Sequence, residues 1–121
     1  MNFFKKLFAA KFQPEDYYET IITDKFVKVE HPKRKTEQIL WKDIEEIKLI
    51  NTDVGPSAPD IWLALLGENS GCLIPHGSLG FDRIYDIVSK YDNFNFENVT
   101  ESMRCADNKE FLLWAKNKNG I

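Results

Sequence analysis

The run IWLALL, residues 61–66, is apolar at every position and constrains the fold more than any other part of the chain. It is far shorter than the about 20 residues that a membrane-spanning helix needs. A short apolar run between turn-forming residues is typical of a β-strand that is buried on both faces. Residues 67–71 follow as a loop of small and polar side chains, and residues 72–75 return as a partner strand. The sequence therefore predicts a hairpin at the centre of a sheet.

The first half of the chain predicts a meander of short antiparallel strands. Residues 17–23 are rich in aromatic and β-branched side chains, and residues 26–31 alternate between two faces. Asp24 and Lys25 predict a two-residue turn between them, and residues 31–36 predict a charged turn. Further strands are expected at residues 37–41 and within residues 41–51, with a tight bend at Lys42 and Asp43.

After Pro75 the apolar period changes from that of a strand to that of a helix. Residues 81–91 carry apolar side chains at helical spacing, and Asn95 predicts the cap of a second helix over residues 96–103. Residues 111–115 predict a last strand. Strands in one block and helices in another indicate an α+β domain. We expect six to seven strands in a mostly antiparallel bent sheet or a partly closed small barrel, with two helices before the final strand.

The N-terminal segment predicts a short amphipathic helix over residues 1–13, ahead of an α+β core over residues 17–116 in one domain. Phe4, Phe8 and Phe12 recur at four-residue spacing. One interpretation is a helix that docks on the sheet or on a second copy of the chain, which would make a homodimer. The alternative is weak attachment to an anionic membrane surface. The membrane contacts would then be Phe3, Phe4, Lys5, Lys6 and Phe8.

The charge balance argues against nucleic acid as a partner. The chain has 16 basic and 19 acidic side chains, and its net charge is −3. Three of the basic residues, and none of the acidic ones, lie within residues 1–13, so the rest of the chain is more acidic still. Phosphate binding needs a basic face. A protein partner agrees better with this balance.

Cysteine usage and the N-terminal composition both favour a cytoplasmic protein. Two cysteines, Cys72 and Cys105, do not make a disulfide framework. Lysines interrupt the N-terminal apolar run where a signal peptide needs it unbroken. We therefore expect reduced thiols and a cytoplasmic location.

The loop at residues 53–60 is the most distinctive irregular segment. Two prolines and a glycine exclude regular structure there, and the stretch DVGPSAPD is bracketed by two aspartates. It is either a rigid connector or a binding loop on a firm scaffold. The binding interpretation names Asp53, Gly55, Pro56, Asp60 and Trp62, with Trp62 as the anchor of a protein contact.

Signals for catalysis or metal binding are weak. His76 follows Cys72 by four residues, which span about 13 Å on a strand and are too far apart to share one ion without a sharp bend. Asp53, Asp60 and His76 are the least implausible catalytic groups, but no phosphate-binding glycine loop or serine-nucleophile motif accompanies them. We therefore expect no enzyme activity, no cofactor and no metal.

Several segments together resemble a family of small, uncharacterised bacterial proteins. They are Trp41-Lys42-Asp43-Ile44, Thr52-Asp53-Val54-Gly55-Pro56 and Gly71-Cys72-Leu73-Ile74-Pro75, with Phe111-Leu112-Leu113-Trp114 near the end. The expected layout of strands is also loosely similar to a pleckstrin-homology domain. The resemblance implies a fold but no activity, substrate or cofactor.

The sequence thus favours a non-catalytic protein-binding module of bacterial origin. One form of it would be a toxin-neutralising immunity protein, because such proteins are often small, acidic and free of catalytic motifs. The alternative is a peripheral membrane protein held by the N-terminal Phe/Lys helix.

Overall fold

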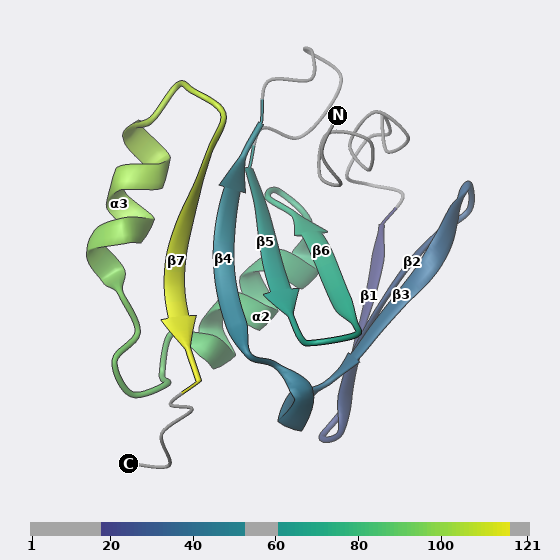
Figure 1. Ribbon diagram of the computed structural model, residues 1–121. Coiled ribbons are helices and arrows are strands. Elements are labelled where there is room, and N and C mark those ends of the chain that lie inside the picture. Colours follow the sequence, from purple (N-terminus) through teal and green to yellow (C-terminus); the bar gives the residue numbers. More distant parts are fainter. Residues whose placement is uncertain (1–17, 53–60, 117–121) are drawn as a thin grey trace.

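The computed structural model describes residues 18–52 and 61–116 (Figure 1). In chain order the elements are β1 (Glu19–Ile22), β2 (Phe26–His31), β3 (Arg34–Leu40), the 3-10 helix η2 (Trp41–Asp43), β4 (Glu46–Asn51), β5 (Ile61–Leu66), β6 (Gly71–Pro75), α2 (Leu79–Val88), α3 (Phe96–Arg104) and β7 (Lys109–Ala115). The predicted α+β class and the two helices before the final strand are confirmed. The helix predicted over residues 1–13 lies outside the described residues.

Within residues 18–52 and 61–116, all strand pairs are antiparallel, and the strands form two sheets rather than one bent sheet or a barrel. The first sheet has the order β1-β2-β3, and the second has the order β6-β5-β4-β7. The expectation of a partly closed barrel is therefore wrong. Figure 1 shows β1, β2 and β3 set at an angle beside the larger sheet, with α2 behind that sheet and α3 beside β7.

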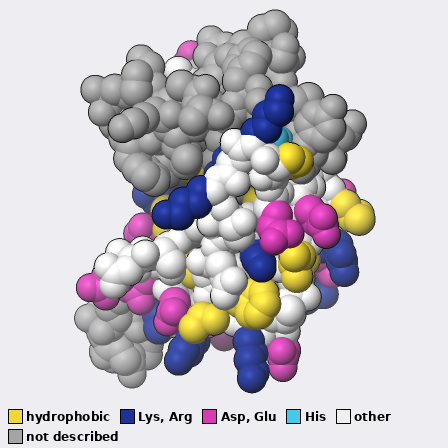
Figure 2. Space-filling model, turned by 90° about the vertical axis from the view of Figure 1, so that its right-hand side faces the viewer, with side chains coloured by type: hydrophobic (Ala, Val, Ile, Leu, Met, Phe, Trp, Pro, Cys, Tyr) yellow, Lys and Arg dark blue, Asp and Glu magenta, His cyan; other side chains and the backbone are white. Residues whose placement is uncertain are grey.

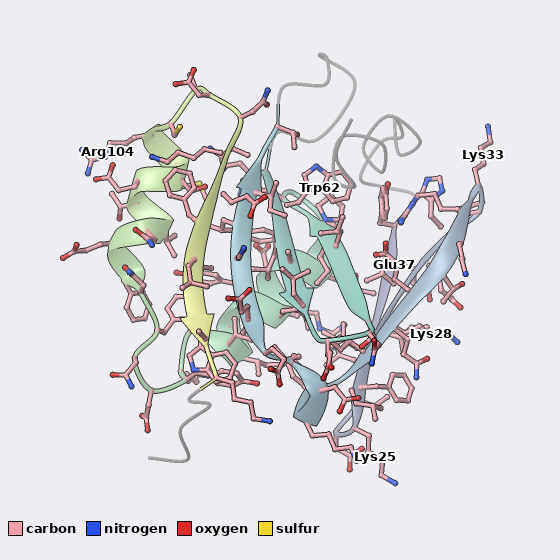
Figure 3. All side chains as sticks on the ribbon, in the orientation of Figure 1. Lys25, Lys28, Lys33, Glu37, Trp62 and Arg104 are labelled. Atoms are coloured by element: carbon pink, nitrogen blue, oxygen red, sulfur yellow. The ribbon has the colours of Figure 1, made fainter. Side chains whose placement is uncertain are left out.

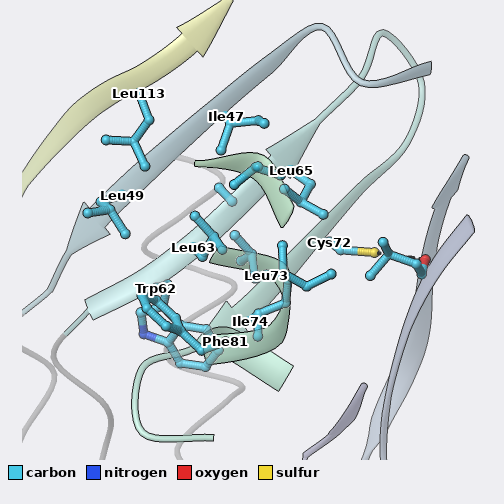
Figure 4. Packing of buried hydrophobic residues seen from close by; sticks show 14 of the residues in the cluster. Ile47, Leu49, Trp62, Leu63, Leu65, Cys72, Leu73, Ile74, Phe81 and Leu113 are labelled. Atoms are coloured by element: carbon cyan, nitrogen blue, oxygen red, sulfur yellow. Dashed lines mark hydrogen bonds between the residues drawn. The ribbon is translucent and has the colours of Figure 1, made fainter. Parts of the chain in front are cut away.

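The two sheets stay separate because β3 and β6 approach each other without forming a hydrogen-bonded ladder. The backbone N–H of Leu73 on β6 donates to the Glu37 carboxylate (2.9 Å) rather than to a strand, and Pro75 has no N–H to offer. Figure 3 shows Glu37 between the two sheets. The Cys72 thiol crosses the same gap and donates to the Val27 carbonyl (3.5 Å), and its sulfur points toward the first sheet in Figure 4.

Strand β5 is the centre of the core, as its apolar sequence predicts. Trp62, Leu63, Ala64 and Leu65 are all fully buried, so both faces of the strand are covered. The bounds predicted for β5 match the structure, and its partner β6 ends at Pro75. One hydrophobic cluster includes residues from both sheets and from α2 (Figure 4).

Helix α2 packs against the first sheet as well as against β6. Ser78 caps its N-terminus by accepting from the Phe81 N–H, and Phe81, Ile84 and Val88 face the core. A Cβ atom at Gly80 would overlap the side chain of Thr20 on β1. The missing side chain of Gly80 is therefore what allows the helix and β1 to approach so closely.

Helix α3 docks through a polar contact and leaves part of its apolar face in solvent. Asn95 caps the helix, as predicted, by accepting from the Asn98 N–H. The buried residue at the centre of the contact is Ser102, whose hydroxyl donates to Asn51 (2.6 Å). The Phe96 and Met103 side chains, which the sequence places on the apolar face, are exposed.

The charged turn predicted at residues 31–36 is shorter than expected. Only Pro32 and Lys33 form the turn, and the His31 Nδ1 atom accepts from the Lys33 N–H. Arg34 already belongs to β3, and its guanidinium pairs with Glu37 (2.8 Å) while almost fully buried. Arg34 was expected in a charged turn, but it lies in β3 and forms a buried ion pair with Glu37.

Candidate functional site

The contact loop expected from the sequence, with Asp53, Gly55, Pro56 and Asp60, lies outside the described residues. The same is true of the membrane contacts expected in the alternative interpretation. Those residues are Phe3, Phe4, Lys5, Lys6 and Phe8.

Trp62 is described, and it is a core residue. Its side chain is fully buried and lies edge-on to the Tyr18 ring, with 5.6 Å between the ring centroids. Because the Trp62 side chain has no exposed surface, its burial does not support the anchor role expected from the sequence, and that role stays a prediction. The apolar sequence around it signalled burial more strongly than exposure.

Two of the groups considered for metal or catalytic chemistry, Cys72 and His76, lie within the described residues and make other contacts. The Cys72 thiol donates to a backbone carbonyl, and the His76 ring packs edge-on against Phe81 at 4.8 Å. Among residues 18–52 and 61–116, no three His, Cys, Asp or Glu residues are grouped so that they could hold a metal ion.

Three half-buried aromatic side chains meet at one end of the larger sheet. They line an open groove of about 510 Å³. Trp41 comes from η2, Tyr91 from the turn after α2, and Trp114 from the end of β7. The full lining is Trp41, Lys42, Ile44, Tyr91, Asp92, Trp114 and Lys116. We call this surface the aromatic groove. Figure 1 shows η2 and the end of β7 at the same end of the molecule.

Hydrogen bonds fix the first wall of the aromatic groove to the turn between β1 and β2. The Trp41 indole N–H donates to the Thr23 carbonyl (2.7 Å), and the Trp41 backbone N–H donates to the Lys25 carbonyl (3.0 Å). The first bond orients the indole ring, and the second holds the backbone that carries it. Trp41 therefore presents a preformed apolar surface.

The second wall is a pair of rings from distant parts of the chain. The Tyr91 and Trp114 centroids are 5.2 Å apart with the rings steeply inclined, a favourable edge-to-face contact. The Tyr91 N–H donates to Val88, and the Lys116 N–H donates to Glu45 (2.8 Å), so both backbones are anchored. Burial raises the pKa of the Tyr91 phenol above its ordinary value.

Charged residues surround the aromatic walls. Lys42, Asp92 and Lys116 are exposed, and the Lys116 ammonium lies 3.5 Å from the Lys42 carbonyl oxygen. A second hollow of about 410 Å³ adjoins the groove because it shares Trp41 and Lys42. Asp24, Lys25 and Leu40 complete the lining of that hollow.

A buried polar cluster lies on the first sheet, at its far end from the groove. The Tyr18 ring contacts His31 (4.7 Å between centroids), and the Arg34 guanidinium lies 5.5 Å from the Tyr18 ring centroid. Burial raises the pKa of the Tyr18 phenol, and the nearby positive charge of Arg34 offsets part of that rise. Because Arg34 is also paired with Glu37, this cluster joins β3 to the rest of the core.

Surface charge in the described part of the chain is mixed. Figure 2 shows Lys and Arg side chains interspersed with Asp and Glu on one face, without a broad field of one sign. Among the described helices, none is long and apolar enough to cross a membrane.

The sequence did not predict the aromatic groove, although Trp41, Tyr91 and Trp114 lie in segments that stand out in the sequence. Trp41 and Trp114 belong to the segments that carry the family resemblance, and Tyr91 continues the apolar face of a predicted helix. All three side chains pack against the hydrophobic core and stay partly exposed at the ends of their elements, which is a signal for a contact surface. The spacing along the chain does not reveal that the three side chains converge.

Comparison with known proteins found no match to a family model, a curated protein or a solved structure. The resemblance to small bacterial proteins stays a prediction.

Proposed function

We propose that this chain is a non-catalytic protein-binding domain and that the aromatic groove is its contact surface. The observation that carries the proposal is the convergence of Trp41, Tyr91 and Trp114, each half-buried, on one open groove. Tryptophan and tyrosine are the residue types that most often dominate the binding energy of protein interfaces.

Rigidity of the groove supports the same proposal. The Trp41 indole and the backbones of Tyr91 and Lys116 are all hydrogen-bonded to other elements. Side chains that are already ordered lose little entropy when a partner binds. A preformed, partly apolar surface of this kind suits recognition of another polypeptide.

The test is capture of a partner from the native host cells by matched variants. Trp114→Ala removes one wall of the groove, whereas Phe96→Ala removes an exposed aromatic side chain on α3 that does not line it. We expect wild type and Phe96→Ala to retain the same protein and Trp114→Ala to lose it. Far-UV circular dichroism of each variant verifies the fold.

Equal recovery of that protein by Trp114→Ala and wild type would show that the groove is not the contact surface. Tyr91→Ala provides a second, independent variant of the same wall. If both groove variants still bind, the proposal fails.

A further inference from the structure

The charges around the aromatic groove indicate what kind of polypeptide it takes. The chain as a whole is acidic, with a net charge of −3. The lining of the groove reverses this balance, because it contains Lys42 and Lys116 but only one carboxylate, Asp92. An acidic segment is therefore better matched in charge to this groove than to the chain as a whole.

The two lysines belong to the same rim of the groove. The Lys116 ammonium reaches the Lys42 backbone carbonyl at 3.5 Å, so the end of β7 and η2 meet at this point. Within the described residues, neither lysine has an ion pair with a carboxylate of this chain. Both lysines are exposed, and the Lys116 ammonium has further N–H groups beyond its contact with the Lys42 carbonyl.

The shape of the surface favours an extended segment over a globular knob. The aromatic groove and the adjoining hollow share Trp41 and Lys42 of η2, so they lie side by side and an extended segment that crosses η2 reaches both. Lys25 lies in the adjoining hollow. A chain laid along both would pass three ammonium groups, those of Lys25, Lys42 and Lys116, and two carboxylates, those of Asp24 and Asp92.

From these observations we infer that the aromatic groove binds an acidic linear segment of a partner protein. The segment presents an aromatic or aliphatic side chain to Trp41, Tyr91 and Trp114, flanked by Asp or Glu residues that face Lys42 and Lys116. This inference rests on the proposed function, since it specifies the partner of the same surface. The aromatic walls supply affinity, and the lysines supply selectivity.

The test begins with selection of phage-displayed random peptides on the full-length protein, with counter-selection on Trp114→Ala. We expect the enriched peptides to combine one large apolar side chain with two or more Asp or Glu residues. Peptides that depend on Trp114 but are neutral or basic would overturn the inference and leave the proposed function standing. Failure to enrich any Trp114-dependent peptide would overturn both.

Charge reversal then measures the role of the lysines. Binding of the best fluorescein-labelled peptide is followed by fluorescence anisotropy with Lys42→Glu, Lys116→Glu and the double variant. We expect each single reversal to weaken binding about fivefold and the double reversal about twentyfold at low salt, with the difference shrinking as salt is added.

Lys33→Glu is the matched control, because it changes the net charge equally at the exposed β2–β3 turn, away from the groove (Figure 3). It is expected to bind the peptide as wild type does. If Lys33→Glu weakens binding as much as Lys42→Glu, the effect comes from overall charge and the inference is wrong.

Discussion

At the scale of single residues, Glu37 connects the two sheets. One carboxylate oxygen accepts from the Leu73 N–H on β6, and the other pairs with Arg34 on its own strand. The Arg34 side chain is only 6% exposed, so its charge depends on this partner. A buried charge that loses its partner is strongly destabilising.

We therefore predict that Glu37→Ala lowers the free energy of unfolding by about 3 kcal/mol. The substitution removes the carboxylate that pairs with the buried Arg34 guanidinium and accepts from the Leu73 N–H. Glu37→Gln keeps a side-chain oxygen for Leu73 and is expected to cost clearly less. Urea denaturation gives both values, with Glu30→Ala at an exposed ion pair as the control. Similar small losses for Glu37→Ala and Glu30→Ala would contradict the assigned role.

A second residue-scale prediction concerns the contact that docks α3. The Ser102 hydroxyl donates to the Asn51 side chain, whose amide donates back to the Ser102 carbonyl (2.8 Å), and both residues are buried. Ser102→Ala leaves the Asn51 oxygen without this donor and is expected to cost about 1–3 kcal/mol. Thr100→Ala, at an exposed position of the same helix, serves as control in the same urea experiment. Equal stability of the two variants would show that Ser102 does not hold the helix.

At the scale of elements, local pattern predicted much of what the structure contains. The bounds of β2 and β5 and the Asn95 cap follow from alternation, apolarity and side-chain capping, which depend on neighbouring residues alone. Local pattern did not predict the start of β3. Arg34 is charged, and its burial depends on the ion pair with Glu37, which the pattern does not show. The outward face of α3 did not follow either, since a polar contact with Asn51 sets its orientation.

At the contact between α2 and β1, helix propensity and packing predict opposite effects of Gly80→Ala on the free energy of unfolding. Propensity alone would make Gly80→Ala stabilising by about 1 kcal/mol. Overlap of the new Cβ with Thr20 makes us expect a loss of about 1–3 kcal/mol instead. The measurement is a double-mutant cycle with Thr20→Gly by urea denaturation, in which Gly80→Ala should cost less when Thr20 is already replaced. A stabilising Gly80→Ala would contradict the close approach.

At the scale of the whole molecule, the site depends on contacts that no local pattern contains. Trp41 and Trp114 lie far apart in the sequence. They come together because η2 directly precedes β4, and the start of β4 pairs with the end of β7. The sequence predicted the strands but not this strand order. It also favoured Trp62 as an anchor, because an aromatic residue next to a proline-rich loop does not reveal whether it points into the core.

The raised pKa of Tyr91 predicts how stability changes at alkaline pH. Its phenol is neutral in both states below about pH 10, the ordinary pKa of tyrosine. Above that, the unfolded chain releases the proton first, because burial holds the folded pKa higher, so stability falls as pH rises. Urea midpoints between about pH 9 and pH 11 should therefore fall more steeply for wild type than for Tyr91→Phe. Parallel curves would contradict a buried phenol at this position.

The three tryptophans of the chain allow the most direct test of the aromatic groove as the contact surface. Trp41 and Trp114 line the groove, whereas Trp62 is buried in the core. With 5-fluorotryptophan incorporated, ¹⁹F NMR resolves one signal for each residue, assigned by single Trp→Phe variants. On titration with a Trp114-dependent peptide, we predict that the Trp41 and Trp114 signals shift and that the Trp62 signal stays in place. A shift of Trp62 alone would place the contact elsewhere and contradict the proposed function.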